Sequence, residues 1–199
     1  MGNTTEAILF NKPYGVISQF RRSPGHITLA AFGFPPAFHP AGRLDADSEG
    51  LLILTSSGRL QHILCEPRYA HPRTYLAQVE RIPDGTALEQ LRSGIRISGH
   101  ACLPCKAAVV ADPGLAPRVP PIRVRKTVPD SWIRLTLTEG KNRQARRMLA
   151  AAGHPVLRLY RKSVGTIDDN NLAPGQWRYL SKEEISAILA HERNSGPRK

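Results

Sequence analysis

Residues 42–55 read GRLDADSEGLLILT and place three carboxylates directly before an apolar run. The carboxylates are Asp45, Asp47 and Glu49, and the apolar run covers residues 51–55. A run of this length bounded by turn-forming residues is typical of a buried strand, and Asp, Ser and Gly favour the turn that precedes it. The stretch therefore predicts an acidic loop at the start of a central strand.

The segments around this strand alternate irregularly between strand and helix patterns. Strands are predicted over residues 7–10, 51–55, 74–79, 101–111, 132–138 and 156–160, and helices over 27–32, 58–65, 84–92, 142–152 and 181–191. Helix starts are predicted at Asp84, at Asn142 and at the capping box formed by Ser181 and Glu184. Because several strands follow one another, the pattern favours an α+β fold with a mixed, largely antiparallel sheet flanked by helices.

The chain has 199 residues, of which 41% are hydrophobic, and this suits one domain or two small subdomains that share a core. We expect a domain over residues 6–191 and a flexible basic tail over 192–199. The first six residues are polar and no segment approaches the ~20 apolar residues of a membrane span. A cytoplasmic location is the resulting expectation.

The positive charge is concentrated in one part of the chain. The formal net charge is +12, and residues 118–163 hold 12 basic and 2 acidic groups, a net of +10. Nine of those 12 bases are arginine, the residue suited to bidentate phosphate contacts. Such a segment favours a polyanionic partner, above all nucleic acid, although a solubilising surface would have the same composition.

The three cysteines point to neither a disulfide framework nor a metal site. Cys102 and Cys105 form one C-x-x-C pair and Cys65 stands alone. A structural zinc site needs four ligands, usually from a second such pair or from histidines at fixed spacing. The expectation is that these are small structural thiols and that the protein uses no metal. No glycine-rich phosphate motif is found, so no nucleotide cofactor is expected either.

Several interpretations compete for the acidic loop. A calcium loop starting at Asp45 would need glutamate at its twelfth position, where the chain has Ser56. A glycoside hydrolase would need Asp45 and Asp47 to converge on one bond, yet alternate residues of an extended segment point to opposite sides. A solvated turn agrees with the composition, and a catalytic carboxylate beside an arginine remains the other possibility.

A resemblance to a known family distinguishes between these interpretations. GRLDADSEGLLILT resembles the central motif of the pseudouridine synthases of the ribosomal small-subunit type. Residues 11–16 (NKPYGV) resemble their first motif, residues 73–79 (RTYLAQV) their tyrosine-bearing strand, and residues 139–148 (EGKNRQARRM) their third motif. The four blocks occur in the family's order over residues 8–165, which makes the resemblance specific.

The resemblance implies a fold of two subdomains with the active-site cleft between them. It also implies isomerisation of a uridine in RNA to its C-glycoside, without metal, redox cofactor or energy source. Asp45 takes the place of the catalytic aspartate, which either attacks C1′ or first removes the C2′ proton. Both roles require an ionised carboxylate close to the ribose.

The remaining site residues follow from the same resemblance. Arg146 takes the place of the cation that keeps the aspartate charged, and it shares one helix face with Arg143 and Arg147 by i, i+3, i+4 spacing. For Arg143 and Arg147 we expect general phosphate contacts. Tyr75 takes the place of the tyrosine that stacks on the uracil, whereas without the resemblance it would be an ordinary core tyrosine.

Two further arginines are candidate contacts to the RNA. Arg43 could fill the space left by a flipped-out nucleotide or contact a phosphate, or it could form an ion pair with Asp47 or Glu49. Arg73 stands where the family often has lysine. The charge is kept but the geometry differs.

The expected partner is ribosomal RNA, a structured stem-loop of 23S rRNA by family analogy. The chain starts almost at the first motif, so we expect no S4 RNA-binding domain, and we expect a monomer. A non-catalytic RNA-binding or ribosome-assembly protein on the same fold is the alternative. It would account for the basic segment but gives no reason to retain Asp45, Tyr75 and Arg146.

Overall fold

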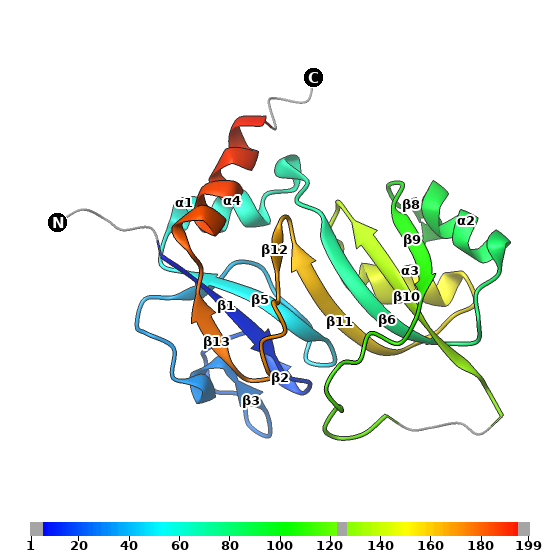
Figure 1. Cartoon of the computed structure of the whole chain (residues 1–199), viewed down its shortest axis with the longest axis horizontal. Coiled ribbons are helices and arrows are strands. Elements are labelled where there is room, and N and C mark those ends of the chain that lie inside the picture. The colour runs from blue at the N-terminus through cyan, green and yellow to red at the C-terminus, as the bar shows by residue number, and fades with distance from the viewer. Residues whose placement is uncertain (1–5, 123–126, 195–199) are drawn as a thin grey trace. The chain divides into compact units, whose positions relative to one another are not determined.

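The structure is a computed structural model that describes residues 6–122 and 127–194, and it divides into two compact units (Figure 1). Unit 1 comprises residues 1–71 and 163–199, and unit 2 comprises residues 72–162. Strand pairs in both units are antiparallel, and one short pair, β2 with β3, is parallel. The predicted α+β class with mixed, mostly antiparallel strands is confirmed.

Unit 1 is built on β1 at the centre of a sheet. Its elements are β1 (Ala7–Lys12), β2 (Val16–Ile17), β3 (Ile27–Thr28), the 3-10 turn η1 (Leu29–Phe32), β4 (His39–Pro40), β5 (Glu49–Thr55), α1 (Gly58–Cys65), the 3-10 turn η2 (Pro67–Tyr69), β12 (Ile167–Asp168), β13 (Trp177–Tyr179) and α4 (Lys182–Asn194). β1 pairs with β13 on one side and with β5 on the other, and β4 also pairs with β5. The register places Lys12, the last residue of β1, opposite Gly50 near the start of β5.

Both faces of the β1–β5 pair are buried, which explains why their sequences are continuous apolar runs. On one face, Leu9 and Ile53 pack in a core that also includes Ile63 of α1 and Ile188 of α4. On the other face, Phe10 packs in an aromatic group. Its ring centroid lies 4.8 Å from that of Phe32 and 5.0 Å from that of Phe34.

Both described helix starts of unit 1 are capped by serine side chains. Ser57 caps α1 by accepting a hydrogen bond from the amide of Leu60. In α4 the amide of Glu184 donates to the Ser181 hydroxyl and the amide of Ser181 donates to the Glu184 carboxylate, which completes the predicted capping box. α4 continues to Asn194, three residues beyond its predicted end. Residues 195–199 of the predicted tail lie outside the described residues.

Unit 2 is built on neighbouring sheet strands with helices packed on one face of them. Its elements are β6 (Arg73–Glu80), α2 (Gly85–Ser93), β7 (Arg96–Ile97), β8 (His100–Ala101), β9 (Lys106–Val110), β10 (Asp130–Leu137), α3 (Gln144–Ala151) and β11 (Val156–Val164), whose last two residues belong to unit 1. The strand order is β11-β6-β10-β9. Asp84 caps α2 as predicted, because its carboxylate accepts from the amide of Ala87.

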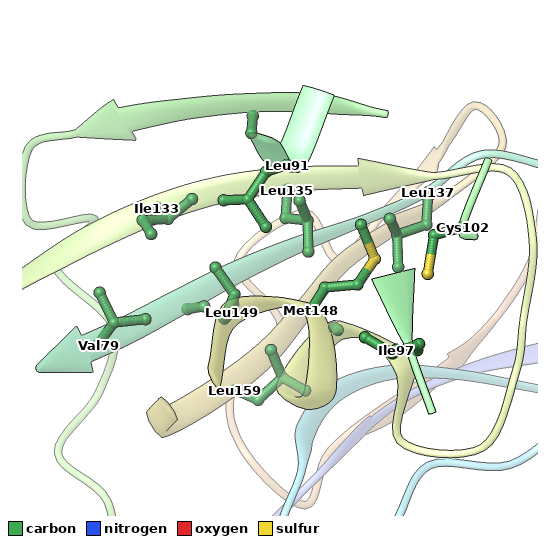
Figure 2. Close-up of a cluster of buried hydrophobic side chains, with 13 residues drawn as sticks. Val79, Leu91, Ile97, Cys102, Ile133, Leu135, Leu137, Met148, Leu149 and Leu159 are labelled. Atoms are coloured by element: carbon green, nitrogen blue, oxygen red, sulfur yellow. The ribbon is translucent and has the colours of Figure 1, made fainter. Parts of the chain in front are cut away.

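The core of unit 2 lies between the sheet and these helices (Figure 2). Met148 and Leu149 of α3 pack with Ile133 and Leu135 of β10, and Leu91 of α2 belongs to the same cluster. The predicted alternation along β10 is confirmed for Ile133, Leu135 and Leu137, which are buried in this core. The other face is not wholly polar as predicted, because Trp132 is buried there in a separate cluster with Leu76 and Tyr160. No helix in the described part of the chain is both long and apolar enough to cross a membrane.

The predicted single strand over residues 101–111 is wrong. It is broken into β8 and β9 by an irregular segment at residues 102–105. Pro104 lacks an amide hydrogen. The neighbouring amides are used elsewhere, because Leu103 donates to the Glu139 carboxylate and Cys105 donates to the Arg92 carbonyl.

Two predicted helices also differ from the structure. Residues 27–32 form the short strand β3 followed by η1, in agreement with the low helix preference of the β-branched Ile27 and Thr28. The prediction that Asn142 caps α3 is wrong, since the N-cap residue is Arg143 in the left-handed conformation, with φ at 49°.

Candidate active site

Asp45 lies on the irregular loop between β4 and β5 of unit 1. Its side chain is half-buried, and its carbonyl accepts a hydrogen bond from the amide of Ser48 at 3.0 Å, which closes a turn before β5. Asp47 is half-buried on the same turn, and Glu49 is buried as the first residue of β5. The acidic loop is therefore a folded turn rather than a freely solvated one.

The segment that follows β1 holds this loop on both sides of Asp45. The Ser18 hydroxyl donates to the Leu44 carbonyl at 2.7 Å and accepts from the Leu44 amide at 3.1 Å. The amide of Gly15 donates to the Ala46 carbonyl at 2.7 Å. Asp45 thus has a fixed backbone on an otherwise irregular segment, which is the condition for aiming a catalytic side chain.

Arg43 lies two residues before Asp45 and its side chain is exposed. Exposure is compatible with contact to an incoming phosphate. Arg43 and Asp45 are the two predicted site residues that unit 1 contains.

Arg73 and Tyr75 lie on β6 of unit 2 and point to the same side of the strand. Tyr75 is half-buried and packs at the margin of the unit 2 core, and its backbone lies opposite Leu135 of β10. Part of its ring surface therefore has a packing role and part stays accessible. Arg73 lies against the third motif, because an added Cβ at Gly140 would be 3.5 Å from its Nη1 atom.

Arg146 lies on α3, on the opposite side of the helix from the buried Met148. It is half-buried, its Nε atom is fully buried, and its Nη1 atom donates to the Val156 carbonyl at 3.4 Å. Val156 is the first residue of β11. The guanidinium is thus held on a helix and against a strand, rather than on a mobile loop.

The other two arginines of α3 differ in their environment. Arg143 is exposed at the N-cap, which agrees with the predicted phosphate contact. Arg147 is half-buried and donates to the Ser98 hydroxyl in the turn between β7 and β8. Arg147 therefore has a structural partner that the sequence did not indicate.

A buried polar network at the start of α3 was also missed. The Gln144 side chain is buried, donates to the Glu139 carboxylate and accepts from the Lys141 amide at 3.0 Å. The same carboxylate accepts from the Leu103 amide at 2.8 Å and lies 3.3 Å from the Lys141 ammonium. The network fixes the loop of the third motif and so the start of the helix that carries Arg146. A glutamate and a glutamine five residues apart around a glycine gave no recognisable signal.

The C-x-x-C pair has the character of structural thiols. Burial raises the pKa of the Cys102 thiol, and burial raises the pKa of Cys105 to about 11. The Cys105 thiol donates to the Leu91 carbonyl at 3.0 Å. Thiols with such pKa values remain protonated near neutral pH and are poor nucleophiles and metal ligands. Across residues 6–122 and 127–194, no group of three or more His, Cys, Asp or Glu side chains is arranged to hold a metal ion.

Comparison with known proteins identifies the family. A family model described as RNA pseudouridylate synthase matches residues 6–151, a span that includes all four sequence motifs. The chain belongs to the RNA pseudouridylate synthase family. Within this family it is 51% identical over 174 residues to ribosomal large subunit pseudouridine synthase E of Xanthomonas campestris, a match covering 86% of this chain and 93% of the relative.

Other pseudouridylate synthases agree with this assignment. The protein of the same name from Vibrio vulnificus is 45% identical over 174 residues, covering 87% of this chain and 74% of the relative. A crystal structure of a pseudouridylate synthase superposes with a TM-score of 0.77 at 27% identity, covering 92% of this chain and 74% of that one. The sequence resemblance and the predicted fold are confirmed by these matches.

Proposed function

We propose that this chain isomerises a specific uridine of ribosomal RNA to pseudouridine, with 23S rRNA as the substrate and Asp45 as the catalytic carboxylate. One observation carries the proposal. In a member of the pseudouridylate synthase family, a half-buried carboxylate lies on a loop whose backbone is hydrogen-bonded on both sides of it. A turn with only a structural role would not need that precision at Asp45.

The reaction is an isomerisation, so its atoms balance without a second substrate. The N1–C1′ bond breaks, the uracil turns, a C5–C1′ bond forms, the proton on C5 is lost, and N1 gains a proton. In our proposal Asp45 either attacks C1′ or removes the C2′ proton to labilise the base. In both versions Asp45 acts as an anion, and the balance requires no oxidant, metal or cofactor.

Arg146 is proposed to supply the positive charge that keeps Asp45 ionised. A carboxylate in a pocket that holds a pyrimidine would otherwise take up a proton because of desolvation. Support comes from the family resemblance of the third motif and from the half-buried, helix-borne guanidinium described above. Arginine suits this role because it stays charged at any physiological pH.

Tyr75 is proposed to stack on the uracil and to assist proton removal from C5. Its half-buried ring on a central strand is compatible with a fixed stacking surface. Arg73 is proposed to balance negative charge near this tyrosine. Arg43 and Arg143, both exposed, are proposed to contact phosphates, and we extend this to Arg147 as an additional role beside its bond to Ser98.

The relatives support the proposed substrate. The names of the Xanthomonas and Vibrio proteins refer to the large ribosomal subunit, and high identity over most of both chains supports the same target here. The basic segment at residues 118–163 supports binding to RNA phosphates. We propose a monomer that acts in the cytoplasm, as a domain over residues 6–191.

The test uses unmodified 23S and 16S rRNA transcripts incubated with the purified full chain. Pseudouridine is then mapped by carbodiimide treatment and primer extension. The proposal predicts modification at a specific uridine of 23S rRNA and none in 16S rRNA. Tight RNA binding without any pseudouridine would support the alternative of a non-catalytic RNA-binding protein, and modification of 16S rRNA alone would refute the substrate.

A further inference from the structure

We propose that Ser18 is a positioning residue for Asp45, whose hydroxyl sets the path of the backbone that carries the catalytic carboxylate. This inference rests on the proposed function. Ser18 lies outside all four sequence motifs, and nothing in its sequence context indicated a role. Its importance follows from the hydrogen bonds of unit 1 alone.

Two hydrogen bonds join Ser18 to Leu44. The Ser18 hydroxyl donates to the Leu44 carbonyl at 2.7 Å and accepts from the Leu44 amide at 3.1 Å. A hydroxyl has a single proton to donate, so that proton is committed to the residue directly before Asp45. Both residues are buried, at 4% exposure for Ser18 and 7% for Leu44, so water cannot readily replace the hydroxyl.

Backbone hydrogen bonds hold the chain at Asp45 and on its other side. The amide of Gly15 donates to the Ala46 carbonyl at 2.7 Å, and the Ser48 amide donates to the carbonyl of Asp45 itself at 3.0 Å. Gly15 has φ at 81°, a conformation that is costly for residues with a side chain. Residues 44, 45 and 46 are therefore each fixed by at least one hydrogen bond, although none belongs to a strand or helix.

We call these hydrogen bonds around Asp45 the clamp, and the segment that donates to it from residues 15–18 is itself anchored to β1. The Lys12 side chain is fully buried, and its ammonium donates to the carbonyls of Pro13 and Val16, both at 2.9 Å. Lys12 ends β1 and is paired with Gly50 of β5. The segment after β1 therefore begins beside the point where the Asp45 loop ends and β5 begins. Ser18 joins the two segments through a side chain rather than through the backbone.

These observations predict an effect on the chemical step. Without the hydroxyl, the Leu44 amide and carbonyl would be buried without this partner, and the loop would shift to satisfy them. A displacement of about 1 Å at a catalytic group can cost on the order of 100-fold in rate. Binding of RNA depends on many separated phosphate contacts and should be much less sensitive to this loop.

The experiment compares Ser18→Ala and Ser18→Cys with two control variants in the full-length protein. Ser23→Ala removes a hydroxyl from the same segment that lies outside the clamp. Ile188→Val should lower stability, because it removes a buried methyl group of α4 from the core of unit 1. For each protein, the single-turnover rate of pseudouridine formation at saturating rRNA transcript, the Kd for that RNA and the urea midpoint are measured.

We expect Ser18→Ala to lower the single-turnover rate by about 10- to 100-fold, with Kd changed less than about twofold. Ser18→Cys, which keeps a side chain of similar size but a weak hydrogen-bonding group, should also be slow. Both controls should retain the wild-type rate, including Ile188→Val with its lowered midpoint.

Three results would overturn this proposal. The first is a folded Ser18→Ala or Ser18→Cys protein that reacts at the wild-type rate. The second is a matching loss of rate in Ile188→Val, which would mean that the effect reports general stability. The third is a lack of pseudouridine with the wild-type protein, which refutes the proposed function as well. Equal rates for wild type and Ser18→Ala refute only the role of Ser18.

Discussion

The guanidinium of Arg146 donates to the carbonyl of Val156, so the arginine of the third motif is held against the first residue of β11. The donor atom is Nη1, and the Nε atom is buried. A guanidinium offers several donors in one plane, which the single ammonium of lysine lacks. This difference makes the identity of residue 146 a sharp test of the proposed charge partner.

Arg146→Lys should lower turnover by about 100-fold or more, because it keeps the charge but loses the planar donors. The matched control is Arg143→Lys, an exposed residue on the same helix turn, which should change turnover only a few-fold. Multiple-turnover kinetics on the rRNA transcript measure both. Equal effects at the two positions would contradict a special role for Arg146.

Tyr75→Phe and Tyr75→Ala separate the two roles of this residue. Loss of the hydroxyl alone should lower turnover at least about tenfold, if it assists proton transfer, with the urea midpoint unchanged. Loss of the ring should in addition lower the free energy of unfolding by about 1–3 kcal/mol, because the ring packs against the unit 2 core. Wild-type turnover in Tyr75→Phe would leave stacking as the sole function.

RNA binding should weaken steeply with salt, with an apparent slope of log K against log salt larger than about 3 in magnitude. The structure indicates which basic side chains can contact RNA phosphates. Arg134 is exposed, but Arg158 is buried and donates to the Ala116 carbonyl at 2.9 Å. Arg134→Gln should reduce the slope by about one, whereas Arg158→Gln should lower stability and leave the slope unchanged. Wild-type RNA binding that does not change with salt would contradict phosphate contacts by the basic segment at residues 118–163.

The stability of α4 should depend on pH through Glu184. The hydrogen bonds from Arg178, at 2.7 and 2.8 Å, lower the pKa of Glu184, and the Ser181 amide adds to this effect. Because its pKa is lowered in the folded state, the ionised carboxylate stabilises the fold fully at pH values above its ordinary pKa near 4.3. This stabilisation is lost as the pH falls through the folded-state pKa.

Glu184→Gln should therefore lower the free energy of unfolding by about 1–2 kcal/mol at pH 7. The difference from wild type should shrink as the pH falls below about 4. Urea titrations across that range measure it, with Glu89→Gln on the exposed face of α2 as the control. A difference that stays constant with pH would exclude an ionic contribution.

The elements with strong local signals were predictable from the sequence. The limits of α1, the capping box at Ser181 and the cap at Asp84 all depend on interactions within a few residues, so they can be read locally. The central strand β5 was clear because both of its faces are buried and its sequence is continuously apolar. The residues of the four motifs were available through their resemblance to a family.

The rest depends on contacts between segments that are distant in sequence. Ser18 and Leu44 are 26 residues apart, and the break between β8 and β9 depends on Glu139, which is 36 residues beyond Leu103. The burial of Gln144 and of Lys12 is also decided by tertiary packing. Local propensity holds no information on such partners, so the polar networks that hold the site had to come from the structure.

The most direct measurement of the central claim is tritium release from RNA labelled at uracil C5, comparing wild type with Asp45→Asn and with Asp47→Asn as the neighbouring control. We predict that Asp45→Asn loses at least about 100-fold in rate with RNA binding largely retained, while Asp47→Asn keeps most of its activity. Release of tritium by Asp45→Asn at the wild-type rate would contradict the assignment of Asp45 as the catalytic carboxylate.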